Sequence, residues 1–371
     1  MARKAIWWFV HQSNVNMRTT ALLCLLLLMN VPAACGQLSD KALDGKVTSI
    51  QTLVDEQAEA GTFSGIAAVG TMNGVYWQRT YGWEDAGAQR PNALSTRFNM
   101  GSITKMMTAV AIGQLIDAGS VRLDATVGTY VPDYPQAIVR DSVTVAQLLN
   151  HTSGLQGYPF EHGSRTVRGI VDTFSQEPLA FSPGSGDAYS NAGFVVAGLI
   201  IERVTGMSYY EYMARRVFEP AGMETAGFFE STGSMRDRAV PYMLDDATGE
   251  RVPAGHLLEL IGSPAGGAYA TVNDMLAFGR ALLDGTLLSD ETRNVLFQPL
   301  RPMGPGVSYG YGVGVHETNG HLSYGHNGGG PGMTADFRIY PDLGATTVLF
   351  NNFGGRESLR LFRNVESVLV Q

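Results

Sequence analysis

The spacing of apolar and polar residues predicts strands near both ends of the chain and helices between them. Alternation predicts strands at 63–70 and 75–81, joined at an Asn-Gly turn, and at 309–315, 321–326, 334–340 and 346–350. Helical spacing predicts helices at 41–60, 102–117, 145–149, 192–204, 271–283 and 357–370. In the second helix, Met107, Ala111 and Leu115 are expected to form one apolar face.

This order predicts an α/β fold of the α+β type. One antiparallel sheet is built from both chain ends and flanked by helices. We expect a single domain over 37–371, into which a helical subdomain is inserted at about 118–258.

Residues 1–36 have the features of an export leader. A nine-residue apolar run at 21–29 follows Arg18 and precedes small residues at 33–36. As a helix this run rises about 14 Å, too short for a bilayer core of about 30 Å. We therefore expect an exported protein, periplasmic or secreted, whose translation starts at Met1 or Met17.

Both cysteines of the chain, Cys24 and Cys35, lie in this leader. The body therefore has no disulfide, no thiolate metal site and no cysteine nucleophile. Cys35 also fits the lipidated first residue of a bacterial lipoprotein, although Pro32 stands where such leaders usually carry Leu, Val or Ile. The alternatives are soluble release and a lipid anchor at Cys35, which would be the one expected membrane contact.

The charge balance excludes one class of partner. The chain carries 26 basic and 34 acidic residues, a net charge of −8, and we find no basic stripe along it. A phosphate backbone would repel such a surface, so nucleic acid is not an expected partner.

The first candidate for chemistry is the S-x-x-K pattern of Ser102 and Lys105 at the start of a predicted helix. Residues three apart share a helix face, so the Lys105 amine can serve as the base that a serine nucleophile needs. The chain has four lysines among 26 basic residues, and Lys105 is the only one after residue 46. Because Arg cannot act as a base and Lys can, this isolation favours a functional Lys105 over a solvated surface charge.

Two further patterns lie in turns beside predicted elements. Tyr-Ser-Asn at 189–191 precedes a helix; a Tyr phenol can relay a proton where nearby cations lower its pKa, and an Asn amide can hold a carbonyl. Gly-His-Asn-Gly-Gly-Gly at 325–330 ends a strand in glycines, which let the backbone approach a ligand. Each pattern also has a structural alternative: a capping Asn with a packed Tyr, or a turn with an incidental His.

Taken together and in this order, the three patterns resemble the S-x-x-K, Y-x-N and K/H-T/S-G motifs of the class C β-lactamase-like serine hydrolases. That family also contains DD-peptidases, D-aminopeptidases and esterases. Further likeness lies in LLNHTSGL at 148–155, SPAGG at 263–267 and YGYGVG at 309–314. The resemblance covers about residues 45–370 and implies a β-lactamase/transpeptidase-like fold.

The resemblance also implies the catalytic roles. Ser102 would be the acylated nucleophile, and Lys105 and Tyr189 would share proton transfer. The backbone N–H groups of Ser102 and Gly329 would form the oxyanion hole. No metal or cofactor is implied, and the partner would be a small-molecule or peptide acyl substrate.

The implied substrate-binding residues are Asn191, which would also orient Lys105, and His326, Gly328 and Gly329 of the third motif. His326 and Asn327 stand where β-lactamases carry Lys and Thr or Ser. A substrate carboxylate would meet a mostly neutral imidazole and no hydroxyl. This departure favours esters, amides or D-amino-acid peptides over efficient β-lactam turnover.

Other interpretations remain. Gly-x-Ser-x-Gly around Ser308 fits an α/β-hydrolase elbow, but a strand rather than a helix is predicted after it. His316, Glu317 and His321 miss the metalloprotease spacing by one residue and fall in predicted strands. A non-catalytic binder of cell-wall peptides or penicillin with the same fold is the alternative function, although a binder has no need for a tuned lysine.

Overall fold

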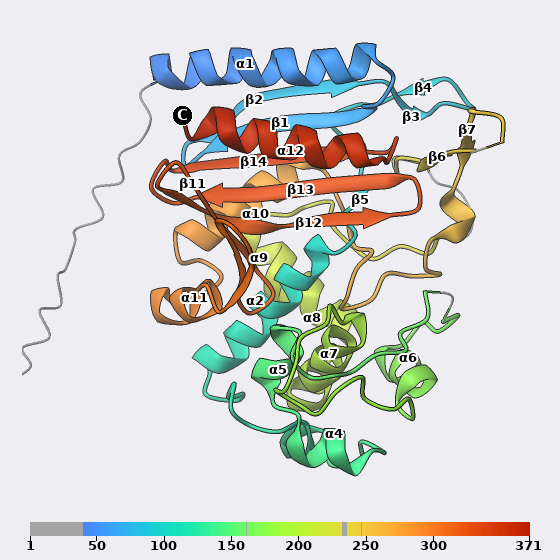
Figure 1. The fold of residues 1–371 in the computed structure, drawn as a ribbon, viewed down its shortest axis with the longest axis vertical. Helices are drawn as coiled ribbons and strands as arrows, with labels where there is room; N and C mark the ends of the chain where they lie inside the picture. Colours follow the sequence, from blue (N-terminus) through green and yellow to red (C-terminus); the bar gives the residue numbers. More distant parts are fainter. Residues whose placement is uncertain (1–39, 161, 232–235, 246) are drawn as a thin grey trace, which may run out of the picture. The chain divides into compact units, whose positions relative to one another are not determined.

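The computed structural model describes residues 40–160, 162–231, 236–245 and 247–371. The leader predicted at 1–36, with Cys35, lies outside these residues. Figure 1 shows the described elements in chain order.

Eight strands form the central sheet: β1 (Gly65–Thr71), β2 (Gly74–Tyr81), β9 (Arg301–Gly304), β10 (Val307–Tyr309), β11 (Gly314–Thr318), β12 (His321–Gly330), β13 (Met333–Tyr340) and β14 (Ala345–Asn351). Their order is β2-β1-β14-β13-β12-β11-β10-β9, and every neighbouring pair is antiparallel. The two chain ends meet where β1 pairs with β14, with Gly65 opposite Asn351. The predicted sheet built from both chain ends, and the α+β class, are confirmed.

The helices are α1 (Asp40–Glu59), α2 (Ile103–Asp117), α3 (Val127–Tyr130), α4 (Ala137–Ser142), α5 (Val145–Leu149), α6 (Val167–Phe174), α7 (Asn191–Thr205), α8 (Tyr209–Tyr212), α9 (Glu219–Ala221), α10 (Val272–Leu283), α11 (Asp290–Leu296) and α12 (Arg356–Leu369). A π-helical turn, Met213–Phe218, and a 3₁₀ turn, Gly255–Leu257, complete the helical segments of the described residues. Short strands pair outside the main sheet: β3 (Trp83–Asp85) with β4 (Arg90–Pro91), β5 (Phe98–Asn99) with β8 (Tyr269–Ala270), and β6 (Tyr242–Leu244) with β7 (Arg251–Pro253).

Helices α1 and α12 lie together on one face of the sheet (Figure 1). Leu43, Val47, Ile50 and Val54 recur at spacings of three and four residues, so α1 presents one apolar stripe to the core. That stripe packs in one cluster with residues of β1, β14 and α12. The terminal helices therefore cover the face of the sheet that lies opposite the helical middle of the chain.

Helix α2 lies on the other side of the sheet and is buried on all its faces from Ile103 to Ile112. The single apolar face predicted through Met107, Ala111 and Leu115 is too narrow a description. Helix α2 contacts β12, α7 and α11 at the same time, and this places apolar neighbours all around it. The packing on all sides therefore holds α2, and the residues of its first turn, in a fixed position.

One predicted strand is wrong in detail. Residues 309–315 form the end of β10 and the start of β11, with a turn between them. Gly310 N–H donates to Val313 O at 2.7 Å, and Gly312 adopts a φ of +79°, which breaks an extended run. An added Cβ at Gly312 would lie 2.6 Å from Ala109 Cβ of α2, so the turn also needs glycine for packing.

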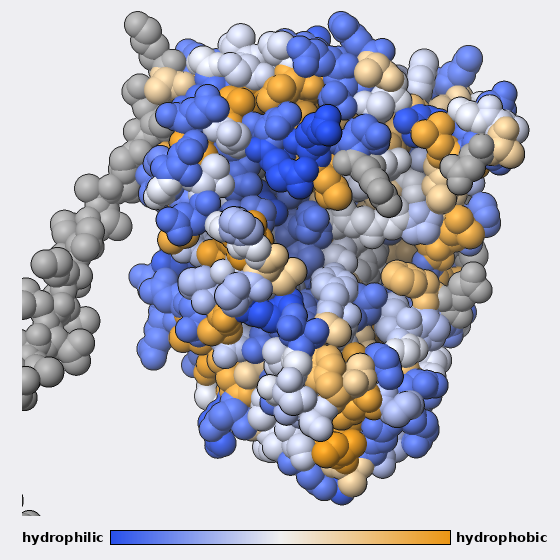
Figure 2. Space-filling view, in the orientation of Figure 1, coloured by the Kyte–Doolittle hydropathy of each residue, from blue (hydrophilic) through white to orange (hydrophobic). Residues whose placement is uncertain are grey.

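Among the described residues, no single helix is long and apolar enough to cross a membrane; the pair Asn191–Thr205 and Tyr209–Ala221 passes that test only jointly and is bent by 80°. On the face seen in Figure 2, apolar side chains are scattered among hydrophilic ones.

Candidate active site

The predicted nucleophile, Ser102, stands at the N-cap of α2. The chain enters the helix through Gly101, whose φ is +50° and whose N–H donates to Asn99 Oδ1 at 2.9 Å. An added Cβ on Gly101 would lie 2.8 Å from Gly329 N, so this close approach of α2 to β12 needs glycine. Ser102 is thereby held beside the glycine-rich strand, with its side chain partly exposed.

Lys105 lies one helical turn further on and is fully buried. Its Nζ donates to Ser102 Oγ at 3.1 Å and to the Ala265 carbonyl at 2.5 Å. The rings of Tyr189 and Phe194 lie 4.7 and 5.6 Å from Nζ. Burial lowers the pKa of Lys105 to about 7, partly opposed by the negative charge of Glu259. A large share of these amines is therefore neutral near pH 7 and able to accept a proton.

Tyr189 comes from the turn before α7, 87 residues from Ser102 in sequence, and donates from Oη to Ser102 Oγ at 2.8 Å. Although the Tyr189 side chain is half exposed, its ring packs at 4.5 Å from the ring of His151. Burial of the hydroxyl raises the pKa of Tyr189 to about 12, and the hydrogen bond to Ser102 opposes this shift. The phenol is therefore protonated at neutral pH and is suited to donate or relay a proton.

Asn191 begins α7, directly after the Ser190 N-cap, whose side chain accepts from Gly193 N–H. Asn191 lines the same cavity as Ser102, Tyr189 and Gly329. Tyr189 lies just before the N-cap of α7 and Asn191 just after it. The Y-x-N spacing thus places the phenol and the amide in the wall of one cavity.

The third motif lies in β12, whose glycines pack against the entry to α2. An added Cβ on Gly328 would lie 2.0 Å from Met100 O, whereas one on Gly329 would meet nothing within 4 Å. Gly328 therefore permits contact between strand and helix, and Gly329 leaves room for a ligand. Gly328 and Gly329 line a second cavity that also contains Ser102, Tyr189 and His326.

His326 is buried and engaged at both ring nitrogens. Its Nδ1 lies 2.5 Å from Asn327 O, which can only accept, so Nδ1 carries the proton. Its Nε2, 3.1 Å from Tyr309 Oη, then accepts from that hydroxyl. Burial, and next the charge of Lys105, lower the pKa of His326 to about 3. His326 lines the second cavity as a neutral imidazole, in agreement with the mostly neutral imidazole that is expected from the sequence.

Several site residues were not identified as such from the sequence. Ala265, whose carbonyl binds Lys105, and the buried His151, whose Nδ1 accepts from Ser190 N–H at 3.0 Å, both lie in stretches noted only for their family resemblance. His151 has a φ of +65°, a sparsely populated conformation for a non-glycine residue. Tyr158 and Glu259 carried no sequence signal, since neither lies in a motif.

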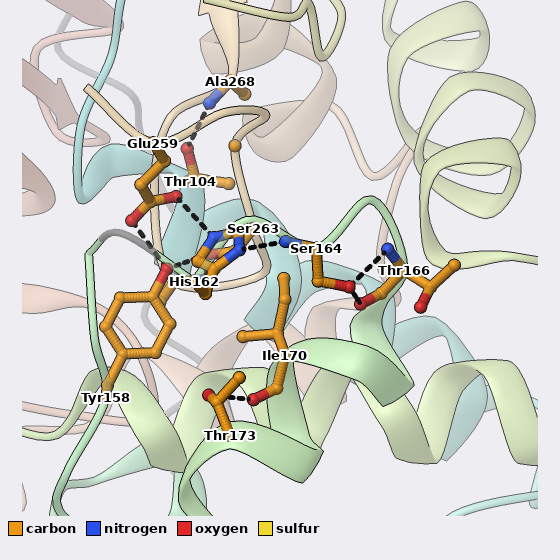
Figure 3. A network of polar contacts seen from close by, with 12 residues as sticks. Thr104, Tyr158, His162, Ser164, Thr166, Ile170, Thr173, Glu259, Ser263 and Ala268 are labelled. Carbon is orange, nitrogen blue, oxygen red and sulfur yellow. Dashed lines mark hydrogen bonds and ion pairs between the residues drawn. The ribbon is translucent and has the colours of Figure 1, made fainter. Parts of the chain in front are cut away.

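The Tyr158 hydroxyl connects two parts of the site wall. It donates to Glu259 Oε1 at 2.6 Å and lies 3.0 Å from Ser263 Oγ (Figure 3). Ser263 Oγ in turn accepts from Ala265 N–H at 3.2 Å. This chain of contacts fixes the loop that presents the Ala265 carbonyl to Lys105.

The competing patterns are not assembled into sites. Ser308 lies inside β10 and is followed by another strand, which is not an elbow. His316 lies beside Glu366 and His321 beside Asp342, so the two histidines have different partners. Within the part of the chain that the structure describes, no group of three or more His, Cys, Asp or Glu residues is arranged to hold a metal.

A family model described as Beta-lactamase matches residues 50–369. The chain belongs to the β-lactamase family. It is 30% identical over 303 residues to the Bacillus subtilis protein PbpX, covering 81% of this chain and 74% of that one. It is also 30% identical over 305 residues to a D-aminopeptidase of Cereibacter sphaeroides, covering 78% and 56%. Esterase EstB of Burkholderia gladioli is 30% identical over 292 residues, covering 66% and 74%.

Solved structures agree with this membership. A penicillin-binding protein from Bacillus halodurans superposes with a TM-score of 0.77 at 28% identity, covering 86% of this chain and 98% of that one. A D-stereospecific amidohydrolase from Streptomyces gives 0.73 at 26% identity, covering 85% and 97%. The predicted resemblance to class C β-lactamase-like serine hydrolases is confirmed, and the chain is a hydrolase of the serine β-lactamase family.

Proposed function

We propose that this chain is an exported serine hydrolase that forms an acyl-Ser102 intermediate from an ester, an amide or a D-amino-acid peptide. One observation carries the proposal: Ser102 Oγ, which lines the cavity together with Tyr189, is contacted by the buried Lys105 Nζ at 3.1 Å and by Tyr189 Oη at 2.8 Å. A nucleophile in contact with both a base and an acid is equipped for acyl transfer. The D-aminopeptidase, esterase and amidohydrolase relatives support this range of substrates.

In acylation, neutral Lys105 takes the hydroxyl proton of Ser102 as Oγ forms a bond to the substrate carbonyl carbon. The bond to the leaving group then breaks, and that group takes its proton from Tyr189. The proton on Lys105 restores the Tyr189 hydroxyl. In deacylation, water replaces serine as the nucleophile, and the same pair returns a proton to Ser102 Oγ as the acid product leaves.

The negative charge of the tetrahedral intermediate requires fixed donors. The backbone N–H groups of Ser102 and Gly329 are our candidates, because Gly101 and Gly328 allow β12 to approach the start of α2. Ser102 N also lies at the N-terminus of a 15-residue helix, the positive end of its dipole.

The third motif supports a limit on the substrate. A neutral His326, with both nitrogens engaged by Tyr309 and Asn327, offers neither a cation nor a free donor to a substrate carboxylate. We therefore propose slow turnover of β-lactams, whose carboxylate is met by Lys and a hydroxyl in β-lactamases. The leader at 1–36 supports export to the periplasm or medium, with either soluble release or a lipid anchor at Cys35.

The test is covalent labelling followed by a substrate comparison. A fluorophosphonate probe should add one label to the purified protein, and peptide mapping should place it on Ser102. Acyl esters, amides, D-Ala-D-Ala peptides and β-lactams are then compared at equal enzyme concentration. A folded protein that neither labels nor turns over any of them would instead be a binding protein of this fold.

A further inference from the structure

The wall of the Ser102 cavity has an uneven chemical composition. Among the described residues that line this cavity of about 200 Å³, Glu259 is the only one with a charged side chain. Much of the rest is aromatic or aliphatic: Phe160, Phe229, Leu257, Leu258, Tyr269 and Met333. A largely apolar pocket with one carboxylate offers its strongest polar interaction to a cation.

The Glu259 carboxylate has few partners for a charge that is largely buried. Its side chain is 11% exposed, and only Oε1 receives a hydrogen bond, from Tyr158 Oη. Within the described residues, Oε2 has no hydrogen-bond partner. A buried carboxylate is costly unless donors or a cation compensate it, so Oε2 has capacity for a further donor.

His162 does not supply the compensating charge. Its Nε2 lies 3.9 Å from Glu259 Oε2, beyond hydrogen-bond distance (Figure 3). Its Nδ1 accepts from Ser164 N–H at 3.2 Å and therefore carries no proton. His162 Nε2, which likewise has no hydrogen-bond partner among the described residues, therefore leaves Oε2 without a donor.

Glu259 also lies close to the reacting groups. Gly267 stands between it and the nucleophile: Gly267 N–H donates to Gly101 O at 3.3 Å, and an added Cβ at Gly267 would lie 3.6 Å from Glu259 Oε2. The Glu259 charge also acts on the Lys105 amine, whose pKa it raises against the effect of burial. A cation held by Glu259 would therefore sit in the cavity that Ser102 also lines.

We propose that Glu259 is a specificity residue that binds a free ammonium group on the acyl side of the substrate, with the apolar wall receiving the adjoining side chain. This inference rests on the proposed acyl-Ser102 chemistry and narrows its substrate class to acyl donors with a free amine. The ammonium binds the Glu259 carboxylate from the cavity that this residue lines, while Tyr158 keeps the carboxylate in place through Oε1.

The test compares two substrates that differ only at the proposed contact. Phenylalanine 4-nitroanilide, in both enantiomers, carries the ammonium, and 3-phenylpropionyl 4-nitroanilide has hydrogen in its place. Measurement at pH 6.5 keeps an α-amino group with a pKa near 7.7–8.0 protonated. For wild type, kcat/KM should favour the ammonium substrate. In Glu259→Gln the ratio of the two kcat/KM values should fall about 10- to 100-fold, the range for a hydrogen-bonded charge.

Two controls separate the charge of Glu259 from its structural role. Tyr158→Phe removes the hydroxyl that contacts Glu259 Oε1 and Ser263 Oγ but keeps the charge of Glu259, so it should lower both kcat/KM values and reduce their ratio much less than Glu259→Gln does. Glu211→Gln removes a carboxylate from the exposed pair with Arg215 and should leave both values unchanged. Circular dichroism and thermal melting establish that each variant is folded.

Each outcome decides between the two proposals. If Ser102 labels normally but Glu259→Gln keeps the wild-type ratio, the ammonium site is overturned while the hydrolase remains. An unchanged ratio together with equal losses on both substrates assigns Glu259 a structural role only. Absence of labelling at Ser102 in the wild type overturns the hydrolase and the ammonium site with it.

Discussion

The Nζ atom of Lys105 donates a hydrogen bond to the carbonyl oxygen of Ala265 at 2.5 Å, across 160 residues of sequence. A carbonyl accepts from both the charged and the neutral amine, so it positions Nζ without fixing its charge. Burial is then the largest influence on the pKa of Lys105, which falls to about 7. The fold thereby converts a strongly basic side chain into one that can accept a proton near neutral pH.

The pH dependence of acylation should follow Lys105. Since the neutral amine is the active form, kcat/KM should rise with pH through about 7 and then level off. His326, with a pKa of about 3, and Tyr189, with one of about 12, should add no step between pH 5 and 9. A pH–rate profile on a non-ionising ester checks this. A profile that falls as pH rises through 7 would exclude Lys105 as the base.

Lys105→Arg should lose at least about 100-fold in kcat, the low end for a general base, because a guanidinium stays protonated. The measurement is single-turnover acylation of the folded variant. Activity within a few-fold of wild type would contradict the proposed role.

Lys105→Met should change the pH dependence of stability. The folded pKa of about 7 lies below the ordinary 10.5, so wild type carries the full cost of the buried amine below pH 7. That cost decreases between pH 7 and 10.5, by about 1.4 kcal/mol for each pH unit. The free energy of unfolding of Lys105→Met relative to wild type should therefore decrease over this range. Urea denaturation at pH 6.5 and 9 measures it; a constant difference would mean that Lys105 has an ordinary pKa.

Ser102→Ala should abolish covalent labelling and nearly all turnover, since it removes the attacking atom. Ser308→Ala, in the competing Gly-x-Ser-x-Gly pattern, should stay within about threefold of wild type, because such changes away from key sites usually cost under ~0.5 kcal/mol. Both variants are compared at matched folded concentration. An inactive Ser308→Ala together with a labelled Ser102→Ala would reverse the assignment of the nucleophile.

Gly328→Ala should destabilise the protein more than Gly329→Ala does. At Gly328 the new Cβ would lie 2.0 Å from Met100 O, which forces β12 away from α2. We expect a lower melting temperature and a loss of labelling. At Gly329 the Cβ meets open space, so the melting temperature should stay near that of wild type. Equal melting temperatures for both variants would show that the close packing of β12 and α2 is not required.

The export leader makes a separate prediction. Expressed in a bacterium with an export system, the mature chain should begin between Ala34 and Gln37. N-terminal sequencing and intact mass check this, and a diacylglyceryl mass on Cys35 would identify a lipoprotein. Retention of residues 1–30 would refute export by cleavage.

The sequence alone determined those features whose cause is local. Hydrophobic spacing predicted α1, α5, α7, α10 and α12, because a helix buries residues three and four positions apart. The contact between Ser102 and Lys105 was predictable for the same reason, since one turn of helix brings them together. Alternation predicted most strands of the sheet, but it did not detect the turn that Gly312 makes between β10 and β11.

Only the tertiary structure decided the features that depend on distant contacts. The Ala265 carbonyl on Lys105, the Tyr158 hydroxyl between Glu259 and Ser263, and the place of Glu259 in the cavity wall join segments about 100 residues or more apart. The spacing of hydrophobic residues does not predict such contacts, because they arise when separate elements pack against one another. The low pKa of Lys105 belongs here too, since burial on all sides by the sheet and the helices produces it.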